Sequence, residues 1–257
     1  MIKLISILKE IYIDEGIVKV PQEVLSKSKD AYDYISKNLE TLKTKSEGKD
    51  WDNPYIDSKF KDYFQLKDLK GQDLKVTIGF YNNPKDAGSG RMDTRKDILL
   101  INLPFLTDVE EFEDLIEHEL VHAMDPKVRD VHIFGRMYAK KGAEPDKFEK
   151  YVKSPWEFDA FTAPLVNKLV LNLKKVPNFK NTLIQLLSDI RSKSLDDIIN
   201  DEKYEQLPYL FSKKEWTEEN FPKIFDEYMF ELQKMKTWAT KPTLYKRFTS
   251  RLGKELS

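Results

Sequence analysis

The sequence contains no cysteine, which excludes disulfide bonds, thiolate metal ligands and a cysteine nucleophile. Long apolar runs are also missing. Residues 1–16 are interrupted by Lys3, Lys9 and Glu10, and no window approaches the roughly 20 apolar residues of a membrane helix. A large net charge is absent as well, because 43 basic side chains nearly balance 44 acidic ones. This balance gives no electrostatic indication of nucleic-acid binding. These absences predict a soluble cytoplasmic protein with neither a membrane nor a nucleic-acid partner.

Apolar periodicity and turn signals divide the chain into a small sheet and several helices. The apolar spacing predicts helices over residues 28–45, 108–124, 182–191, 217–238 and 244–256, and one more that begins at Ser154. Strand-like runs cover residues 74–81 and 97–103. The segment between these two runs is rich in glycine, asparagine and charge, and it predicts a flexible connection.

This order of elements predicts an α+β protein, with a small mixed sheet packed on a central helix and a mostly helical C-terminal half. The chain is long enough for one sizeable domain or two small ones. We expect a helical segment over residues 1–50, a core that holds the sheet and the central helix over 51–175, and a helical subdomain over 176–257.

Histidine is scarce, and two of the three histidines lie in the segment Leu115-Ile-Glu-His-Glu-Leu-Val-His-Ala123. His118 and His122 are four residues apart, so on a helix they share one face, with Cβ atoms about 5–6 Å apart. Two imidazoles in this arrangement can bind one zinc ion at about 2.0–2.1 Å. Glu119 is rotated by about 100° from His118 and can approach a zinc-activated water without becoming a ligand. The spacing therefore predicts a zinc site with Glu119 as the general base.

The predicted helix around this motif is amphipathic and capped. One face carries Val109, Phe112, Ile116, Leu120 and Ala123, and both histidines fall outside that face. Thr107 and Glu110 stand at the spacing of a capping box. A solvated helix that bears two histidines by chance is the alternative explanation, and the amphipathic pattern favours the metal site over it.

A catalytic zinc usually has three protein ligands and one open position. Glu157 is the predicted third ligand, because it lies at the start of the helix announced by Ser154 and Pro155. Its position three residues after Ser154 also fits a simple capping residue. His132 is the rival ligand, although its distance from His122 does not match the compact three-histidine motif. Pro164 should kink or end the helix that begins at Ser154.

Other polar side chains are candidates for supporting roles. Asp125 and Asp159 can orient an imidazole, as metal-bound histidines usually require, and ordinary helix-end roles explain them equally well. An oxyanion stabiliser is also expected, and the candidates are Tyr138, Tyr151 and His132.

The His-Glu-x-x-His motif resembles the signature of the zincin superfamily of metallopeptidases, and with a later glutamate it is similar to the gluzincin branch. Residues 157–163 resemble a helix of ImmA/IrrE-type metallopeptidases, and HELVHAMDPK with SPWEFDAF is similar to small phage-encoded metallopeptidases. The resemblance implies a zinc peptidase fold and an edge strand that pairs with extended substrate, for which residues 97–103 are the candidate. Val121 departs from the ImmA/IrrE pattern, which often has glycine there. No convincing helix-turn-helix supports a regulatory role.

The function expected from the sequence is zinc-dependent hydrolysis of a protein or peptide substrate. The alternative is a non-catalytic, zinc-stabilised structural or assembly protein, virion-associated if the chain is phage-encoded. A third reading, association with nucleic acid, rests on the basic residues of 241–254. A solvated amphipathic helix explains those residues better.

Overall fold

The computed structural model describes residues 19–86, 89–106, 108–125, 149, 152–214 and 216–256. These residues form two compact units, one within Val18–Tyr151 and the other within Val152–Ser257. Together they give an α+β protein, as predicted. The finer division at residues 50 and 175 stays a prediction. No helix in the described part of the chain is long and apolar enough to cross a membrane.

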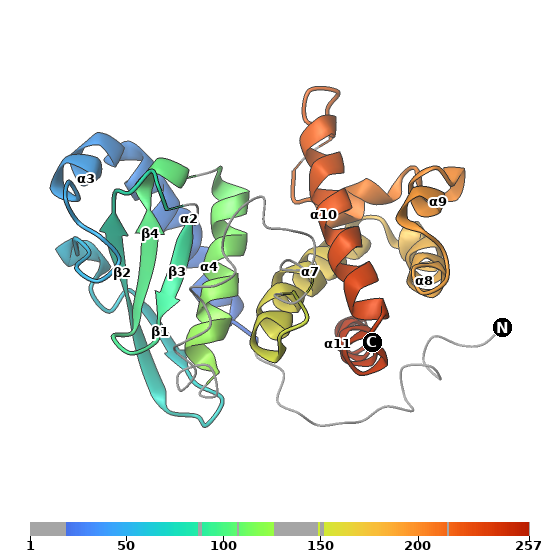
Figure 1. Ribbon diagram of the computed structural model, residues 1–257, viewed down its shortest axis with the longest axis horizontal. Helices are drawn as coiled ribbons and strands as arrows, with labels where there is room; N and C mark the ends of the chain where they lie inside the picture. The colour runs from blue at the N-terminus through green and yellow to red at the C-terminus, as the bar shows by residue number, and fades with distance from the viewer. Residues whose placement is uncertain are drawn as a thin grey trace. The chain divides into compact units, whose positions relative to one another are not determined.

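The first unit contains a four-stranded mixed sheet (Figure 1). Its strands are β1 (Phe64–Lys67), β2 (Asp73–Tyr81), β3 (Gly90–Asp93) and β4 (Ile98–Asn102). Their order across the sheet is β1-β2-β4-β3, with β2 and β4 parallel and the other two pairs antiparallel. Every residue of β4 is buried, which is typical of a strand at the centre of a small sheet.

Two helices, α2 (Gln22–Lys37) and α4 (Val109–Met124), pack against each other and against the sheet. α2 contacts β1 and α4 contacts β3. The buried residues Ala31 and Ile35 supply the inner face of α2. The helix predicted over residues 28–45 is divided at Asn38, after which α3 (Leu39–Lys45) begins. The result is a sheet whose edge strand β3 lies beside the motif helix α4.

Two sequence-based expectations about the sheet are wrong. The connection expected over residues 82–96 contains the strand β3, which has only four residues, all half-buried, and therefore shows no apolar alternation. Residues 97–103 were expected to form the edge of the sheet, but β4 lies between β2 and β3. The edge beside α4 is β3.

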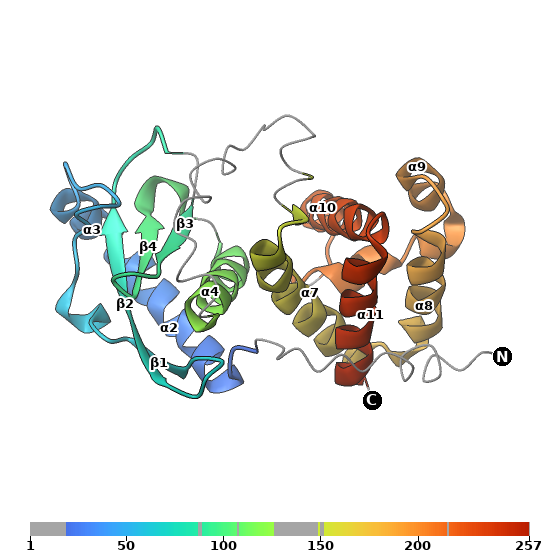
Figure 2. The ribbon, with the colours of Figure 1, turned by 60° about the horizontal axis from the view of Figure 1, so that its bottom comes forward.

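The second unit is helical (Figure 2). It consists of α7 (Pro155–Lys175), α8 (Lys180–Asp189), α9 (Leu195–Ile199), α10 (Phe221–Ala239) and α11 (Pro242–Leu256), with short 3₁₀ helices between them. α11 packs on both α7 and α10. The ends of α8, α10 and α11 lie within four residues of the predicted ends. The five-residue α9 was not predicted.

The helix α7 continues through Pro164 to Lys175, so of the two predicted effects of this proline the helix end is wrong, and the kink stays a prediction. Proline removes one amide donor from the helix, but side chains of α11 pack beside it. The guanidinium of Arg251 is buried and donates a hydrogen bond to Thr162 Oγ1 at 3.2 Å. Arg247 donates to both carboxylate oxygens of Asp159. Two of the basic residues in 241–254 thus take part in packing within the unit, which weakens the nucleic-acid reading.

Trp238 is the largest fully buried side chain of this unit. Its ring lies 5.2 Å from that of Phe158 on α7 and 5.4 Å from that of Phe248 on α11, measured between centroids. Its indole Nε1 donates a hydrogen bond to the carbonyl of Val152 at 3.0 Å. Trp238 of α10 therefore contacts both the start of α7 and the side of α11 that carries Phe248.

Candidate metal centre

The motif helix α4 begins at Val109, one residue later than predicted. Its N-cap is Asp108, whose carboxylate accepts a hydrogen bond from the Glu111 amide at 3.0 Å. The N-cap is therefore Asp108 and not the predicted Thr107, which lies outside the described residues. Aspartate serves this position as well as threonine, and its charge suits the positive end of the helix dipole.

The packing face of α4 is confirmed in large part. Phe112, Ile116, Leu120 and Ala123 are buried, and Val109 is half-buried. Because this face is fixed against the sheet and α2, the rotation of the helix about its axis is fixed too. The polar motif residues are consequently held on a defined side of the helix.

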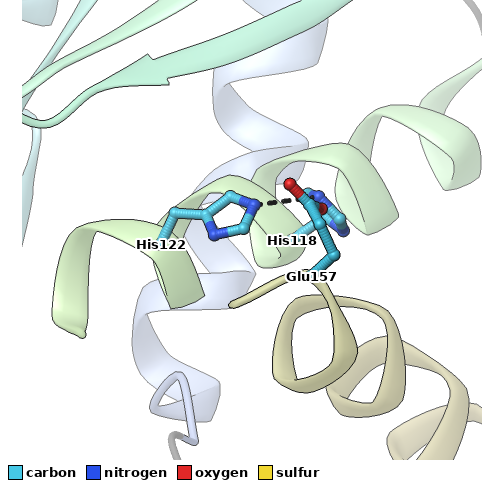
Figure 3. A group of neighbouring side chains, drawn as sticks. All are labelled: His118, His122 and Glu157. Carbon is cyan, nitrogen blue, oxygen red and sulfur yellow. Dashed lines mark hydrogen bonds between the residues drawn. The ribbon is translucent and has the colours of Figure 1, made fainter. Parts of the chain in front are cut away.

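The two motif histidines point toward each other (Figure 3). His122 Nε2 lies 3.2 Å from His118 Nε2, with the ring planes at 85°. Two nitrogens bound at about 2.0–2.1 Å to one tetrahedral zinc are separated by about 3.3 Å. His122 is buried and His118 half-buried. The pair thus has the spacing that two ligands of a single ion require.

Glu119 is oriented by the edge strand. It is 8% exposed, and its Oε2 accepts a hydrogen bond from the backbone N–H of Met92 on β3 at 2.7 Å. A hydrogen bond to an ionised acceptor is shorter and stronger than a neutral one. Oε1 accepts no hydrogen bond from the described residues and is left for a water molecule. The strand therefore orients the carboxylate through Oε2 and leaves Oε1 available to accept a proton.

Arg91, the neighbour of Met92 on β3, adds a positive charge near this carboxylate. Burial lowers the pKa of Arg91, but a hydrogen bond to Tyr81 and the charges of Asp86 and Glu119 outweigh burial and raise it. Its guanidinium forms an ion pair with Asp86 and lies 5.5 Å from the centre of the Trp51 ring. Arg91 is therefore a fixed cation close to the Glu119 carboxylate.

Gly90 allows β3 to approach α4 closely. A Cβ atom at this position would lie 3.0 Å from Leu115 Cδ2 on α4 and 3.0 Å from the Leu100 carbonyl oxygen. Both distances are tighter than most packing contacts, so a larger residue requires the Leu115 side chain or the strand to shift by a few tenths of an ångström. The hydrogen bond from Met92 to Glu119 depends on this approach, because Met92 is only two residues further along β3.

A Gly90→Ala substitution is therefore expected to destabilise the protein by about 1–3 kcal/mol, the usual cost of overpacking, and to weaken the Met92–Glu119 hydrogen bond. Urea unfolding followed by circular dichroism measures the stability. Adding Leu115→Ala removes the side chain that the new methyl group would meet, and it should recover part of the loss. A double variant whose free energy of unfolding shows simple additivity of the two losses would contradict the close-contact explanation.

Glu157 lies in the first turn of α7, where the predicted cap is confirmed. Ser154 is the N-cap, and its hydroxyl accepts a hydrogen bond from the Glu157 amide at 3.3 Å. The side chain of Glu157 is half-buried. Glu157 belongs to a different compact unit from the two histidines, and its role as their third ligand stays a prediction. Two imidazole nitrogens and one carboxylate oxygen form a donor set that suits zinc.

The remaining candidates are placed differently. Asp125 is the C-cap of α4, where its amide donates to the Val121 carbonyl. Asp159 is held by Arg247 through two hydrogen bonds of 2.8 and 3.1 Å. Their proposed roles beside an imidazole stay predictions. Three further candidates lie outside the described residues: His132, Tyr138 and Tyr151.

Sequence reasoning missed the contribution of β3. Gly90 and Met92 of this strand position Glu119 directly, and Arg91 between them supplies the nearby charge. The available signal was Gly90 at the start of a short segment before residues 97–103. Turn-forming residues surround this segment, so it did not indicate a strand.

Comparisons of the chain with family models, curated proteins and solved structures found no match of any of the three kinds. The chemistry of the chain therefore has to be inferred from its own residues.

Proposed function

We propose that the chain is a zinc-dependent peptidase in which His118, His122 and Glu157 bind the metal and Glu119 is the general base. The observation that carries this proposal is the 3.2 Å separation of the two imidazole nitrogens, next to a carboxylate oriented by a separate hydrogen bond. A hydrogen bond between the two rings gives the same distance, but a chance pair of histidines would not need an oriented carboxylate beside it.

Each residue has a distinct task in this proposal. The two histidines and Glu157 leave one position open in a tetrahedral site. Zinc, when bound, supplies Lewis-acid activation of a water molecule and of the scissile carbonyl. Glu119 accepts the proton of the attacking water through Oε1 and then donates it to the leaving amine. The Met92 amide keeps the carboxylate in place during both transfers.

The substrate is proposed to bind as an extended strand along β3. This strand forms the edge of the described sheet, and an edge presents backbone groups that another strand can pair with. β3 also contacts α4 and supplies the hydrogen bond to Glu119. A peptide paired with β3 would therefore run beside the general base. Residues 97–103 were the predicted site of substrate pairing, but they contain β4, which is already paired on both sides. We therefore assign this role to β3.

Zinc content per chain tests the proposed metal site. Wild-type protein purified without added metal is expected to contain about one zinc, and Glu157→Ala is expected to lose most of it, because two histidines alone bind zinc weakly. Mass spectrometry of the metal in dialysed protein measures this. Glu218→Ala, at an exposed position before α10, is the control and should keep its zinc.

Two results would contradict parts of this proposal separately. Full zinc content in Glu157→Ala would remove Glu157 from the ligand set and make His132 the next candidate. A wild-type protein that binds no zinc even after reconstitution would overturn the metal site itself.

A further inference from the structure

The helical unit contains a groove that the proposed peptidase site does not use. Its volume is about 360 Å³, and it lies between the segment that follows α9 and the first half of α10. In Figure 2 these elements are coloured from light orange to orange-red. All of its walls come from residues 199–228, within a single unit of the chain.

Every charged side chain that lines this groove is acidic: Asp201, Glu202 and Glu205. Asp201 is already neutralised, since Lys193 and Lys203 lie 3.2 and 3.0 Å from its carboxylate. Glu202 and Glu205 are exposed, and no ion pair joins either of them to another described residue. The groove therefore presents two uncompensated negative charges.

Aromatic rings form much of the rest of the wall, which also includes Ile199, Asn200 and Pro208. Phe221, Phe225 and Tyr228 follow one another along α10, with ring centroids 6.0 and 6.2 Å apart. Tyr204 adds a fourth ring. The faces of aromatic rings carry partial negative charge and attract cations, and acidic groups beside them strengthen the attraction. The ring surface also suits the aliphatic part of a long basic side chain.

Tyr228 provides an independent indication of a ligand. It lines the groove and is only 2% exposed, yet its hydroxyl has no hydrogen-bond partner among the residues that the structure describes. Burial raises the pKa of Tyr228, so the group stays protonated at neutral pH. Buried hydroxyls normally find a partner, and a donor that entered the groove would supply one.

We propose that this groove binds a lysine or arginine side chain presented by a basic segment of a polypeptide partner. The cationic head pairs with Glu202 and Glu205, and the aliphatic stem lies along the aromatic wall. A polypeptide fits better than a free polyamine because Phe221 at the groove is 39% exposed and can contact apolar neighbours of the basic residue. This site does not depend on zinc or on hydrolysis.

Fluorescence anisotropy with a labelled 12-residue peptide that contains two central lysines tests the proposal. The full-length chain carries Glu119→Gln, so that the peptide stays intact. The double substitution Glu202→Gln with Glu205→Gln is expected to weaken binding about tenfold or more, because both charges that meet the cation are lost. The matched control, Glu218→Gln with Glu219→Gln, changes the net charge equally at exposed positions outside the groove and should alter affinity by less than about twofold.

Further measurements distinguish specific binding in the groove from general electrostatic attraction. Tyr228→Phe keeps the ring and removes the hydroxyl, and it should weaken binding about threefold. The same peptide with acetylated lysines should not bind. The proposal is overturned if the lysine peptide fails to bind, if the acetylated peptide binds equally well, or if the control pair weakens binding as much as the groove pair. Displacement of the peptide by spermine at equal concentration would identify a polyamine site instead.

Discussion

A Glu119→Gln variant is expected to keep its zinc and to lose peptidase activity by about 10²–10⁴-fold, the usual contribution of a general base. The amide can still accept the hydrogen bond from Met92, so the side chain should remain in place. It cannot accept a proton from water. Hydrolysis of an unfolded protein substrate, measured alongside zinc content, tests this expectation directly.

Glu111→Gln is a suitable control for this experiment. Glu111 is exposed in the first turn of the same helix, and its substitution should leave the rate nearly unchanged. If Glu119→Gln cleaved at the wild-type rate, the assignment of the base would be wrong. A wild-type protein that held zinc but cleaved no protein or peptide would favour the structural or assembly alternative.

Trp238→Ala is expected to lower the free energy of unfolding by about 3–5 kcal/mol, as removal of a large buried aromatic side chain usually does. The substitution empties a fully buried site and removes the ring contacts with Phe158 and Phe248. It also leaves the Val152 carbonyl without the indole donor. The start of α7, where Glu157 lies, should loosen first. Chemical denaturation followed by circular dichroism gives the magnitude.

Trp216→Ala separates this effect from a general sensitivity to tryptophan loss. Trp216 is 50% exposed and contacts the ring of Tyr209 at a centroid distance of 5.9 Å. Its removal should change stability by no more than about 0.5 kcal/mol. Equal losses in the two variants would show that Trp238 has no special role in the packing of α7, α10 and α11.

The helices could be predicted because their signals are local. The apolar residues of α4 repeat at helical spacing, and most of the predicted inner face is buried. Ser154 and Glu157 announce the start of α7 at short range, and the cap is where the pattern places it. The continuation of α7 through Pro164 could not be predicted, because the local signal of a proline is that the helix ends or kinks there.

The sheet was harder to predict than the helices. β1 and β3 have four residues each, too few to show a clear period of two. Strand order also depends on pairings between distant segments, so the pairing of β3 with β4 could not be predicted from either strand alone, although the unbroken apolar run of β4 is typical of a buried strand. For the same reason, the motif predicted Glu119 as the base but did not reveal that Met92 would hold it.

The backbone amide of Met92 gives the protein a natural spectroscopic probe. An outward-facing amide on an edge strand normally exchanges quickly with solvent deuterium, whereas this one donates to a buried carboxylate at 2.7 Å. Its chemical shift and exchange rate should therefore follow the integrity of this hydrogen bond. Nuclear magnetic resonance of a single nitrogen could thus report whether the carboxylate of the base is held in place in the intact protein, without any substrate.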